Sequence, residues 1–297
     1  MSVQDSDSAP AGTDSDVVLI DKRPFVRVGA RPNIFRYIGQ MWSYRHFILF
    51  DARARVAGSA ANDALGRLWM LLNPILNGAT YFLVFGVLLG TGRGIENFLG
   101  YLIIGVFMFR YTTSSVTAGS KAIVGNRPVI RAFSFPRATL AVATNVRELI
   151  SNIPTFLMMF VLVLAIPPSE PITWAWLLFV PALALNFIMN LGLGLFLARL
   201  VARWNDVTHL IAFGTRAWLY LSCVFFSADR FAGNEPLTAL MNANPMFCVL
   251  DIVRDILLYG GMGDPARWLV LGAWALGALV IGGLVFWQAE ESYGREQ

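Results

Sequence analysis

Residues 268–287 read WLVLGAWALGALVIGGLVFW, which is a run of consecutive residues without a charged side chain. An α-helix of about 20 apolar residues is long enough to cross the roughly 30 Å hydrocarbon core of a bilayer. Five earlier stretches have the same character, and none alternates with the period of two that a barrel strand requires. We therefore expect an all-α membrane protein with six transmembrane helices, at residues 68–89, 98–119, 149–166, 174–201, 209–227 and 268–287.

The composition supports this fold class and excludes several others. Of the 297 residues, 56% are hydrophobic and 14% are charged, whereas a soluble domain has about 45–50% apolar and about 25% charged residues. The chain is therefore not expected to be a soluble enzyme, a secreted mini-domain or a disordered chain. Its two cysteines, Cys223 and Cys248, show no metal-binding or redox spacing, and two histidines are too few for a histidine-rich metal site.

Basic residues are unevenly distributed between the two sides of the membrane that six spans would create. If both termini lie in the cytosol, 16 of the 23 Lys and Arg residues fall in inner segments and 4 fall in outer loops. Cytoplasmic loops of membrane proteins carry such an excess of positive charge. The bias predicts a multi-pass protein of the cytoplasmic (inner) membrane with both termini cytosolic.

Four segments outside the six spans have their own patterns. Residues 1–33, acidic and then basic, predict a disordered cytosolic tail without the apolar stretch of a signal peptide, and residues 290–297 predict a second tail. Residues 34–57 place apolar side chains at helical spacing beside several arginines, which predicts an amphipathic interfacial helix or, alternatively, a cytosolic docking helix. Residues 228–262 form a semi-apolar run broken by proline and glycine, which predicts two short re-entrant helices on the outer side.

Sequence motifs for catalysis are absent. The chain has no phosphate-cradling GxxxxGK[ST], no GxSxG, no HExxH, no CxxC and no acidic metal cluster. The spans also lack the mid-membrane carboxylates that are typical of proton or sodium relays. No catalytic, metal-binding or cofactor-binding residue is therefore predicted, and uphill transport would take its energy from an ion gradient or from another subunit.

Two arginines lie within the predicted spans and more than two residues from a span end. Arg110 is the one clear charge in the middle of a span. It either snorkels or pairs with Glu148, or it faces a water-filled pathway and meets an anionic substrate. Arg216 lies about two turns past His209, so it is expected to snorkel to the inner surface.

Hydroxyl and aromatic side chains are dense in these spans. Hydroxyls within a span either bond between helices or line a polar passage. Aromatic rings either pack or, by stacking on the apolar faces of sugar rings, let a glycan pass, much as rings stack on bases in single-stranded nucleic acids. The candidates for lining a passage are Tyr81, Phe85, Tyr101, Phe107, Arg110, Tyr111, Thr113, Thr117 and Trp218.

Three motifs and their order along the chain resemble a known family. They are DALGRLWMLLNP at 63–74, NRPVIRAFSFPR at 126–137, and RWNDVTH at 203–209, which is followed by a span and then by Asn244-Pro245-Met246. Over residues 34–287 the chain resembles the type-2 ABC exporter permeases of the polysaccharide branch. That branch moves O-antigens, capsules, teichoic acids and related lipid-linked glycans.

The resemblance implies a homodimer with a tunnel between two six-span subunits, each with a permease domain at 58–289 and a separate ABC ATPase docked on it. ATP and Mg would bind to those two ATPase copies. Residues 34–57 resemble the gate helix of the family and residues 228–262 its paired re-entrant helices. Residues 121–137 resemble the coupling helix that enters a groove of the ATPase, and an ordinary positive inner loop is the alternative. The predicted coupling residues are Asn126, Arg127, Pro128, Ile130, Phe133, Phe135 and Pro136.

The cargo that the resemblance implies is a lipid-linked glycan, either O-antigen-like or a cell-wall galactan on a polyprenyl pyrophosphate carrier. Arg53, Arg55 and Arg67 could meet that pyrophosphate, or equally the anionic headgroups of membrane lipids. Two alternatives stay open: an ABC-2 permease for a small drug or lipid, and a membrane-embedded transferase, although His46 and His209 have no catalytic partners close in sequence. No nucleic-acid partner is expected.

Overall fold

A computed structural model describes residues 33–61, 66–88, 90, 95, 97–133, 135–165, 171–228 and 233–294. Within these residues the chain is helical and contains no β-strand, as the predicted all-α class requires. The predicted tail at 1–33 lies outside the described residues except for Asn33. The same holds for residues 63–65 of the first motif, residues 229–232 and the end of the 290–297 tail.

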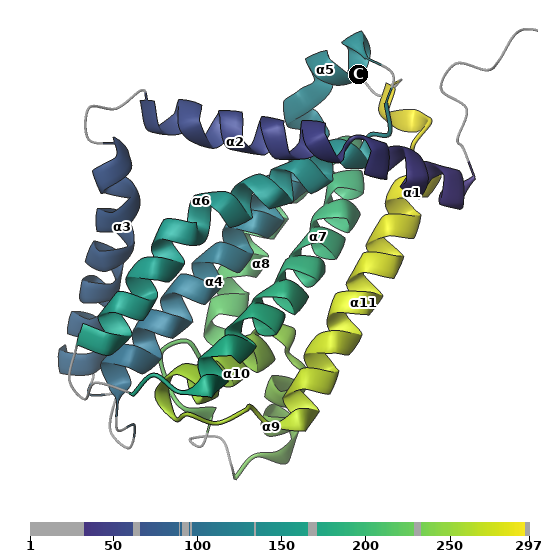
Figure 1. Cartoon of the computed structure of the whole chain (residues 1–297). Coiled ribbons are helices and arrows are strands. Elements are labelled where there is room, and N and C mark those ends of the chain that lie inside the picture. Colours follow the sequence, from purple (N-terminus) through teal and green to yellow (C-terminus); the bar gives the residue numbers. More distant parts are fainter. Residues whose placement is uncertain are drawn as a thin grey trace, which may run out of the picture. The chain divides into compact units, whose positions relative to one another are not determined.

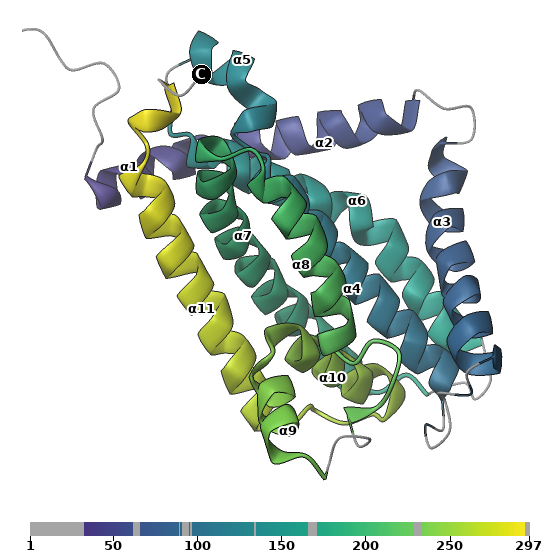
Figure 2. The same ribbon diagram turned by 180° about the vertical axis from the view of Figure 1, so that it is seen from behind.

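Four helices of the described chain are long and apolar enough to cross a membrane. Each coincides with one of the predicted spans, and the four run side by side in Figures 1 and 2. The helix predicted at 149–166 begins well before residue 149, so Arg147 and Glu148 belong to it. The four helices are α4 (Phe98–Ser120), α6 (Ala138–Ala165), α7 (Phe179–Arg203, led by the 3-10 helix η3, Trp174–Leu178) and α11 (Pro265–Gln288).

The other two predicted spans contain shorter helices. At 68–89, α3 (Gly66–Tyr81) continues as a π-helix, η1 (Phe82–Leu88). At 209–227, α8 (Val207–Leu221) has only 15 residues and ends in a turn. Because only four helices of the described chain qualify individually by length and hydropathy, the structure does not establish the predicted count of six.

Two further helices form a sharply bent pair. α9 (Glu235–Ala243) and α10 (Pro245–Leu258) meet at Asn244 with an angle of 80° between them. The Asn244 side chain caps α10 by accepting a hydrogen bond from the Met246 N–H at 3.0 Å. The prediction of two short helices in this region is therefore confirmed, and together they count either as a re-entrant pair or as a broken fifth span.

The segment predicted as one helix at 34–57 is two helices. α1 (Ile34–Ser43) ends at Tyr44, and α2 (Arg45–Ala61) follows it. Figures 1 and 2 show α2 running across the ends of α4 and α6, at the end of the bundle opposite to α9 and α10. We call this the α2 end.

The α2 end also holds the region predicted to couple to an ATPase. Residues 121–137 leave α4, form a 3-10 helix, η2 (Val124–Asn126), and a short α-helix, α5 (Arg127–Ala132), and then enter α6. Residues after α11, including η5 (Ser292–Gly294), reach the same end (Figure 1). The first and the last described residues therefore lie at one end of the bundle.

The main core surrounds α4, whose residues from Gly100 to Phe109 are all buried. Aromatic rings join α4 to its neighbours: Tyr111 meets Phe156 of α6 edge-on at 5.3 Å, and Phe156 meets Phe179 of α7 at 5.9 Å between ring centroids. The outer helix α11 instead exposes large apolar side chains such as Leu269 and Val280. An apolar exposed face is what a helix in contact with lipid requires.

Close backbone contact between α7 and α11 depends on glycine. A Cβ atom added at Gly192 would overlap the α11 backbone at Ala278, and one added at Gly282 would overlap the Gly192 carbonyl. Small residues let membrane helices approach closely enough for extensive van der Waals contact, which takes the place of the hydrophobic driving force available in water.

Gly282→Val should therefore separate α7 from α11 and destabilise the protein by about 1–3 kcal/mol, as overpacking of a filled site does. Gly283→Val is the matched control, since a Cβ atom there meets no atom within 4 Å. Thermal unfolding in detergent should show a lower melting temperature for the Gly282 variant alone. Equal melting temperatures for the two variants would contradict this packing.

Candidate functional site

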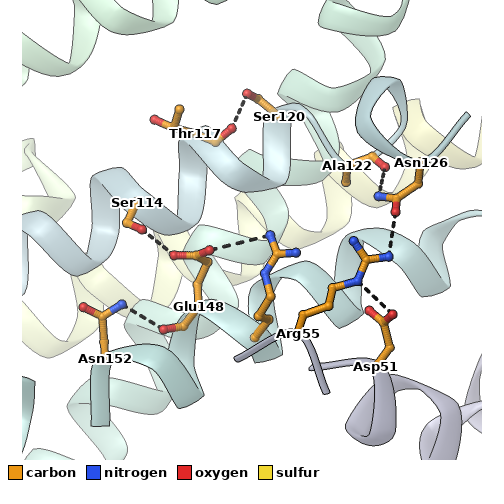
Figure 3. Close-up of polar contacts among 10 residues, drawn as sticks. Asp51, Arg55, Ser114, Thr117, Ser120, Ala122, Asn126, Glu148 and Asn152 are labelled. Atoms are coloured by element: carbon orange, nitrogen blue, oxygen red, sulfur yellow. Dashed lines mark hydrogen bonds and ion pairs between the residues drawn. The ribbon is translucent and has the colours of Figure 1, made fainter. Parts of the chain in front are cut away.

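Arg55 joins α2 to the predicted coupling region. Its guanidinium Nη2 donates to Asn126 Oδ1 at 3.0 Å, and its Nε lies 2.9 Å from Asp51 Oδ1 one turn earlier in α2 (Figure 3). The Asn126 amide is oriented for this contact, because its Nδ2 donates to the Ala122 carbonyl at 2.8 Å. The sequence predicted Arg55 as a pyrophosphate or headgroup contact. In the structure its side chain links α2 to Asn126, and we call this pair of contacts the Arg55 tie.

Two of the three predicted pyrophosphate arginines, Arg53 and Arg55, do not face the same side of α2. Arg53 is exposed on α2, two positions before Arg55, and residues two apart point to different faces of a helix. The side chain of Arg67 lies outside the described residues.

A second set of hydrogen bonds at the α2 end centres on Glu290, just after α11, and we call it the Glu290 tie. The Tyr37 hydroxyl of α1 donates to Glu290 Oε2 at 2.7 Å, and the Arg137 N–H donates to Glu290 Oε1 at 2.9 Å. The Arg137 guanidinium also bonds the Glu290 carbonyl oxygen. In turn, the Tyr37 oxygen accepts from the Ala138 N–H at 3.0 Å. One buried carboxyl thus connects α1, the start of α6 and the segment after α11.

Burial controls the protonation of this tie. It raises the pKa of the Glu290 carboxyl above its ordinary value, against the opposing effect of the hydrogen bonds from Arg137 and Tyr37. Burial, and then the neighbouring carboxyl, raise the pKa of the Tyr37 hydroxyl as well, so this hydroxyl keeps its proton and acts as a donor. The sequence predicted only a tail at Glu290, because its partners are more than a hundred positions away.

The predicted coupling residues divide into an anchored set and an outward set. Ile130 and Pro136 are buried, and the Phe135 ring packs against Tyr44 and Phe47 at 6.1 and 6.2 Å between centroids. Phe133, by contrast, is 68% exposed. One face of the segment is therefore packed against the rest of the chain, and the opposite face is exposed. The rest of the set comprises Asn126 in the Arg55 tie, half-buried Arg127 and exposed Pro128.

Arg110 is the exposed residue in a stretch of α4 that is otherwise buried from Gly100 to Thr112. Glu148 is not its partner. The Glu148 carboxylate accepts a hydrogen bond from Ser114 Oγ (Figure 3). It also lies 3.7 Å from Arg147 Nη2. The structure thus does not form the predicted Arg110–Glu148 pair.

The predicted passage-lining hydroxyls follow Arg110 along α4. The Thr113 hydroxyl donates back to the carbonyls of Phe109 and Arg110, each at 3.1 Å. Thr117 is half-buried, and its carbonyl accepts from Ser120 Oγ at 2.8 Å. Thr113 is therefore satisfied by its own helix and needs no second helix to hold it.

The predicted passage-lining aromatic residues separate into two groups. Phe107 and Tyr111 are fully buried and Tyr101 nearly so, which makes all three core residues in this structure. Tyr81 and Phe85, at the end of the α3–η1 segment, are half-buried and gather around Phe225 instead. The Phe85 and Phe225 rings stack at 4.2 Å with only 6° between their planes.

Trp218 of α8 is half-buried, and its indole N–H donates to Asn244 Oδ1 at 2.8 Å. Its ring also meets Phe109 of α4 edge-on at 6.1 Å. Trp218 therefore fixes α8 to α4 and to the hinge of the bent pair at once. The sequence singled out Asn244 only through the resemblance, and Phe225 was not among the residues predicted to line a passage.

Arg254, one of the four basic residues that the sequence placed in outer loops, is a buried residue of α10. Its guanidinium donates to the carbonyls of Tyr101, Cys223 and Val224 at 3.2–3.3 Å and lies 3.3 Å from the centroid of the Tyr101 ring. Cys223 has a left-handed backbone with φ of 52°, which is unusual for a residue other than glycine. Arg254 therefore stabilises the tight turn after α8 by bonding the carbonyls that this turn exposes.

Comparison with known proteins agrees with this arrangement. Residues 53–258 match the family model described as "ABC-2 type transporter". The chain belongs to the ABC-2 type transporter family and is a multi-pass membrane protein of that family, which confirms the resemblance found in the sequence.

Two relatives of this chain share the same protein name. The O-antigen export system permease protein RfbA of Myxococcus xanthus is 22% identical over 263 residues, which cover 88% of this chain and 98% of that protein. The protein of the same name from Klebsiella pneumoniae is 24% identical over 203 residues, which cover 67% of this chain and 75% of that protein.

The raised pKa of Glu290 predicts how the tie responds to pH. Burial favours the protonated carboxyl, so its stabilising contribution is present at acidic pH and is lost as the pH rises above the ordinary value of about 4.3 and through the raised pKa. Glu290→Gln removes this titration. The melting temperature of the wild type should therefore fall relative to that of the variant as the pH is raised from about 4.3 toward neutrality.

Glu291→Gln, at the neighbouring exposed position, is the control and should keep the pH dependence of the wild type. A wild type that gains stability over Glu290→Gln as the pH rises would contradict the raised pKa.

Proposed function

We propose that this chain is the permease subunit of an ATP-driven exporter that moves a lipid-linked polysaccharide across the cytoplasmic membrane. Membership of the ABC-2 type transporter family supports a transport role, and the relatives named as O-antigen export permeases support a polysaccharide cargo. The observation that carries the proposal furthest is the exposed face of the 121–137 segment, held by Arg55 to the segment that resembles a gate helix.

Energy for export comes, in this proposal, from a separate ABC ATPase that binds and hydrolyses ATP with Mg. Two ATPase copies serve a homodimer of this chain, one docked on each α5 region. The α5 region suits such docking because exposed Phe133 offers an apolar contact and Arg131 a positive charge, while buried Ile130 keeps the segment attached to its own subunit. A displacement of α5 is transmitted to α2 through the hydrogen bond between Asn126 and Arg55.

The proposed topology keeps six crossings and places the α2 end in the cytosol. The α3–η1 segment and α8 supply the two crossings whose helices are short, and the α9–α10 pair enters the outer leaflet without crossing it. The excess of basic residues in the segments of the α2 end supports this orientation. The aromatic group around Phe225 then lies toward the outer mouth, where rings can stack on sugars of the passing glycan.

Phe133→Asp tests both the function and the role of this segment. In cells depleted of the chain, lipid-linked glycan should accumulate on the cytosolic side, and the wild-type chain should remove it. Phe133→Asp should fail to do so and should lose the co-purifying ATPase, because a charge replaces the apolar contact. Its melting temperature should match that of the wild type, since the side chain is 68% exposed.

Phe133→Leu is the matched control and should export normally, because it keeps an apolar side chain at the same position. Normal export by Phe133→Asp would remove this segment from the mechanism. Depletion without any build-up of lipid-linked glycan would contradict the proposed function itself.

A further inference from the structure

Two arginines lie at the same level of the bundle, near the middle of the membrane-spanning helices. Phe109 of α4 and Trp218 of α8 meet edge-on at 6.1 Å. Arg110 follows Phe109 by one residue and Arg216 precedes Trp218 by two, so both Cα atoms lie within about 3 Å of this contact along the helix axes at 1.5 Å per residue. Both arginines are exposed in this chain.

In the part of the chain that the structure describes, neither guanidinium forms a hydrogen bond or an ion pair with another side chain. Glu148 of α6, whose carboxylate meets α4 one turn after Arg110, is held by Ser114 and Arg147. The six predicted spans themselves contain no Asp or Glu.

Arg110 is far from both ends of its helix. It stands ten residues before the end of α4 and twelve after its start, which is about 15 Å and about 18 Å along the helix. Arg216 stands nine residues after the start of α8 and five before its end, which is about 14 Å and about 8 Å. Arg110 therefore lies more than one side-chain length from either end of α4, and Arg216 lies as far from the start of α8.

A charged side chain facing lipid at this depth is strongly unfavourable, and arginines inside membranes almost always face water or a partner. Exposed arginines without a protein partner therefore indicate a hydrated passage that carries an anion. Guanidinium groups match phosphate well, because their planar set of N–H donors binds its oxygens in pairs.

We infer that Arg110 and Arg216 are two positive charges at mid-depth that the phosphate groups of the lipid carrier meet as they cross the membrane. The inference rests on the proposed function, since it requires that the cargo is linked to a phosphorylated lipid. It adds a binding site at the step with the highest electrostatic barrier, which is the passage of the anionic headgroup through the hydrocarbon layer. An acidic sugar would present similar chemistry, so the experiment must separate the two sources.

Binding to the full-length chain in nanodiscs separates them. The probes are geranylgeranyl pyrophosphate, geranylgeraniol, which has the same lipid chain without the anion, and an oligouronate, which is an acidic glycan without a lipid. The wild type should bind the pyrophosphate probe far more tightly than the other two. The double variant R110Q/R216Q should bind it at least tenfold more weakly, whereas R110K/R216K should keep most of the affinity because it keeps the charge.

Arg203→Gln is the control, since Arg203 is an exposed arginine at the end of α7 and not at mid-depth. Its affinity for the pyrophosphate probe should equal that of the wild type. Wild-type affinity in R110Q/R216Q, with an unchanged melting temperature, would overturn the site. Tighter binding of the oligouronate than of the pyrophosphate probe would overturn the carrier assignment. Both outcomes are distinct from failure of the proposed function, which the accumulation of lipid-linked glycan measures separately.

Discussion

A hydrocarbon layer offers no hydrogen bonds, and this constraint shapes every part of the bundle. It requires the backbone to pair internally, so the spanning segments are helices. It removes the hydrophobic attraction between those helices, so α7 and α11 rely on close contact at Gly192 and Gly282. It also makes a charged side chain within the bundle unfavourable unless the charge meets a polar partner or water. Arg254 is satisfied by three carbonyl oxygens, whereas Arg110 is exposed and its guanidinium forms no hydrogen bond or ion pair within the residues that the structure describes.

At the α2 end, hydrogen bonds made by side chains connect elements that are separate in the sequence. Glu290 joins α1, the start of α6 and the residues after α11. Arg55 joins α2 to the segment before α5. In the proposed function, a force that an ATPase applies to α5 would reach α2 through Asn126, while the Glu290 tie holds α1 to the start of α6 and to the residues after α11. Transport in this account is a displacement of these tied elements that the chain cannot drive alone.

Local sequence patterns were sufficient to predict the long apolar helices. They failed where contacts between distant parts of the chain determine the position of a residue. The uninterrupted apolar run of 268–287 predicted α11 directly. The break at Tyr44 carries neither proline nor glycine, so periodicity alone gave one helix there. Arg254 read as an ordinary outer-loop charge because its carbonyl partners lie 30 to 153 positions away in the sequence. Burial of Phe107 and Tyr111 likewise depends on which face of α4 meets α6 and α7, which composition does not specify.

The central claim is that this polypeptide is a conduit whose motive force is supplied by a nucleotide-hydrolysing companion. Reconstitution into liposomes with a fluorescent lipid-linked oligosaccharide, with and without the ATPase, tests it most directly. Our account predicts ATP-dependent movement of the glycan across the bilayer only when both proteins are present. Uphill movement by this chain alone would contradict it.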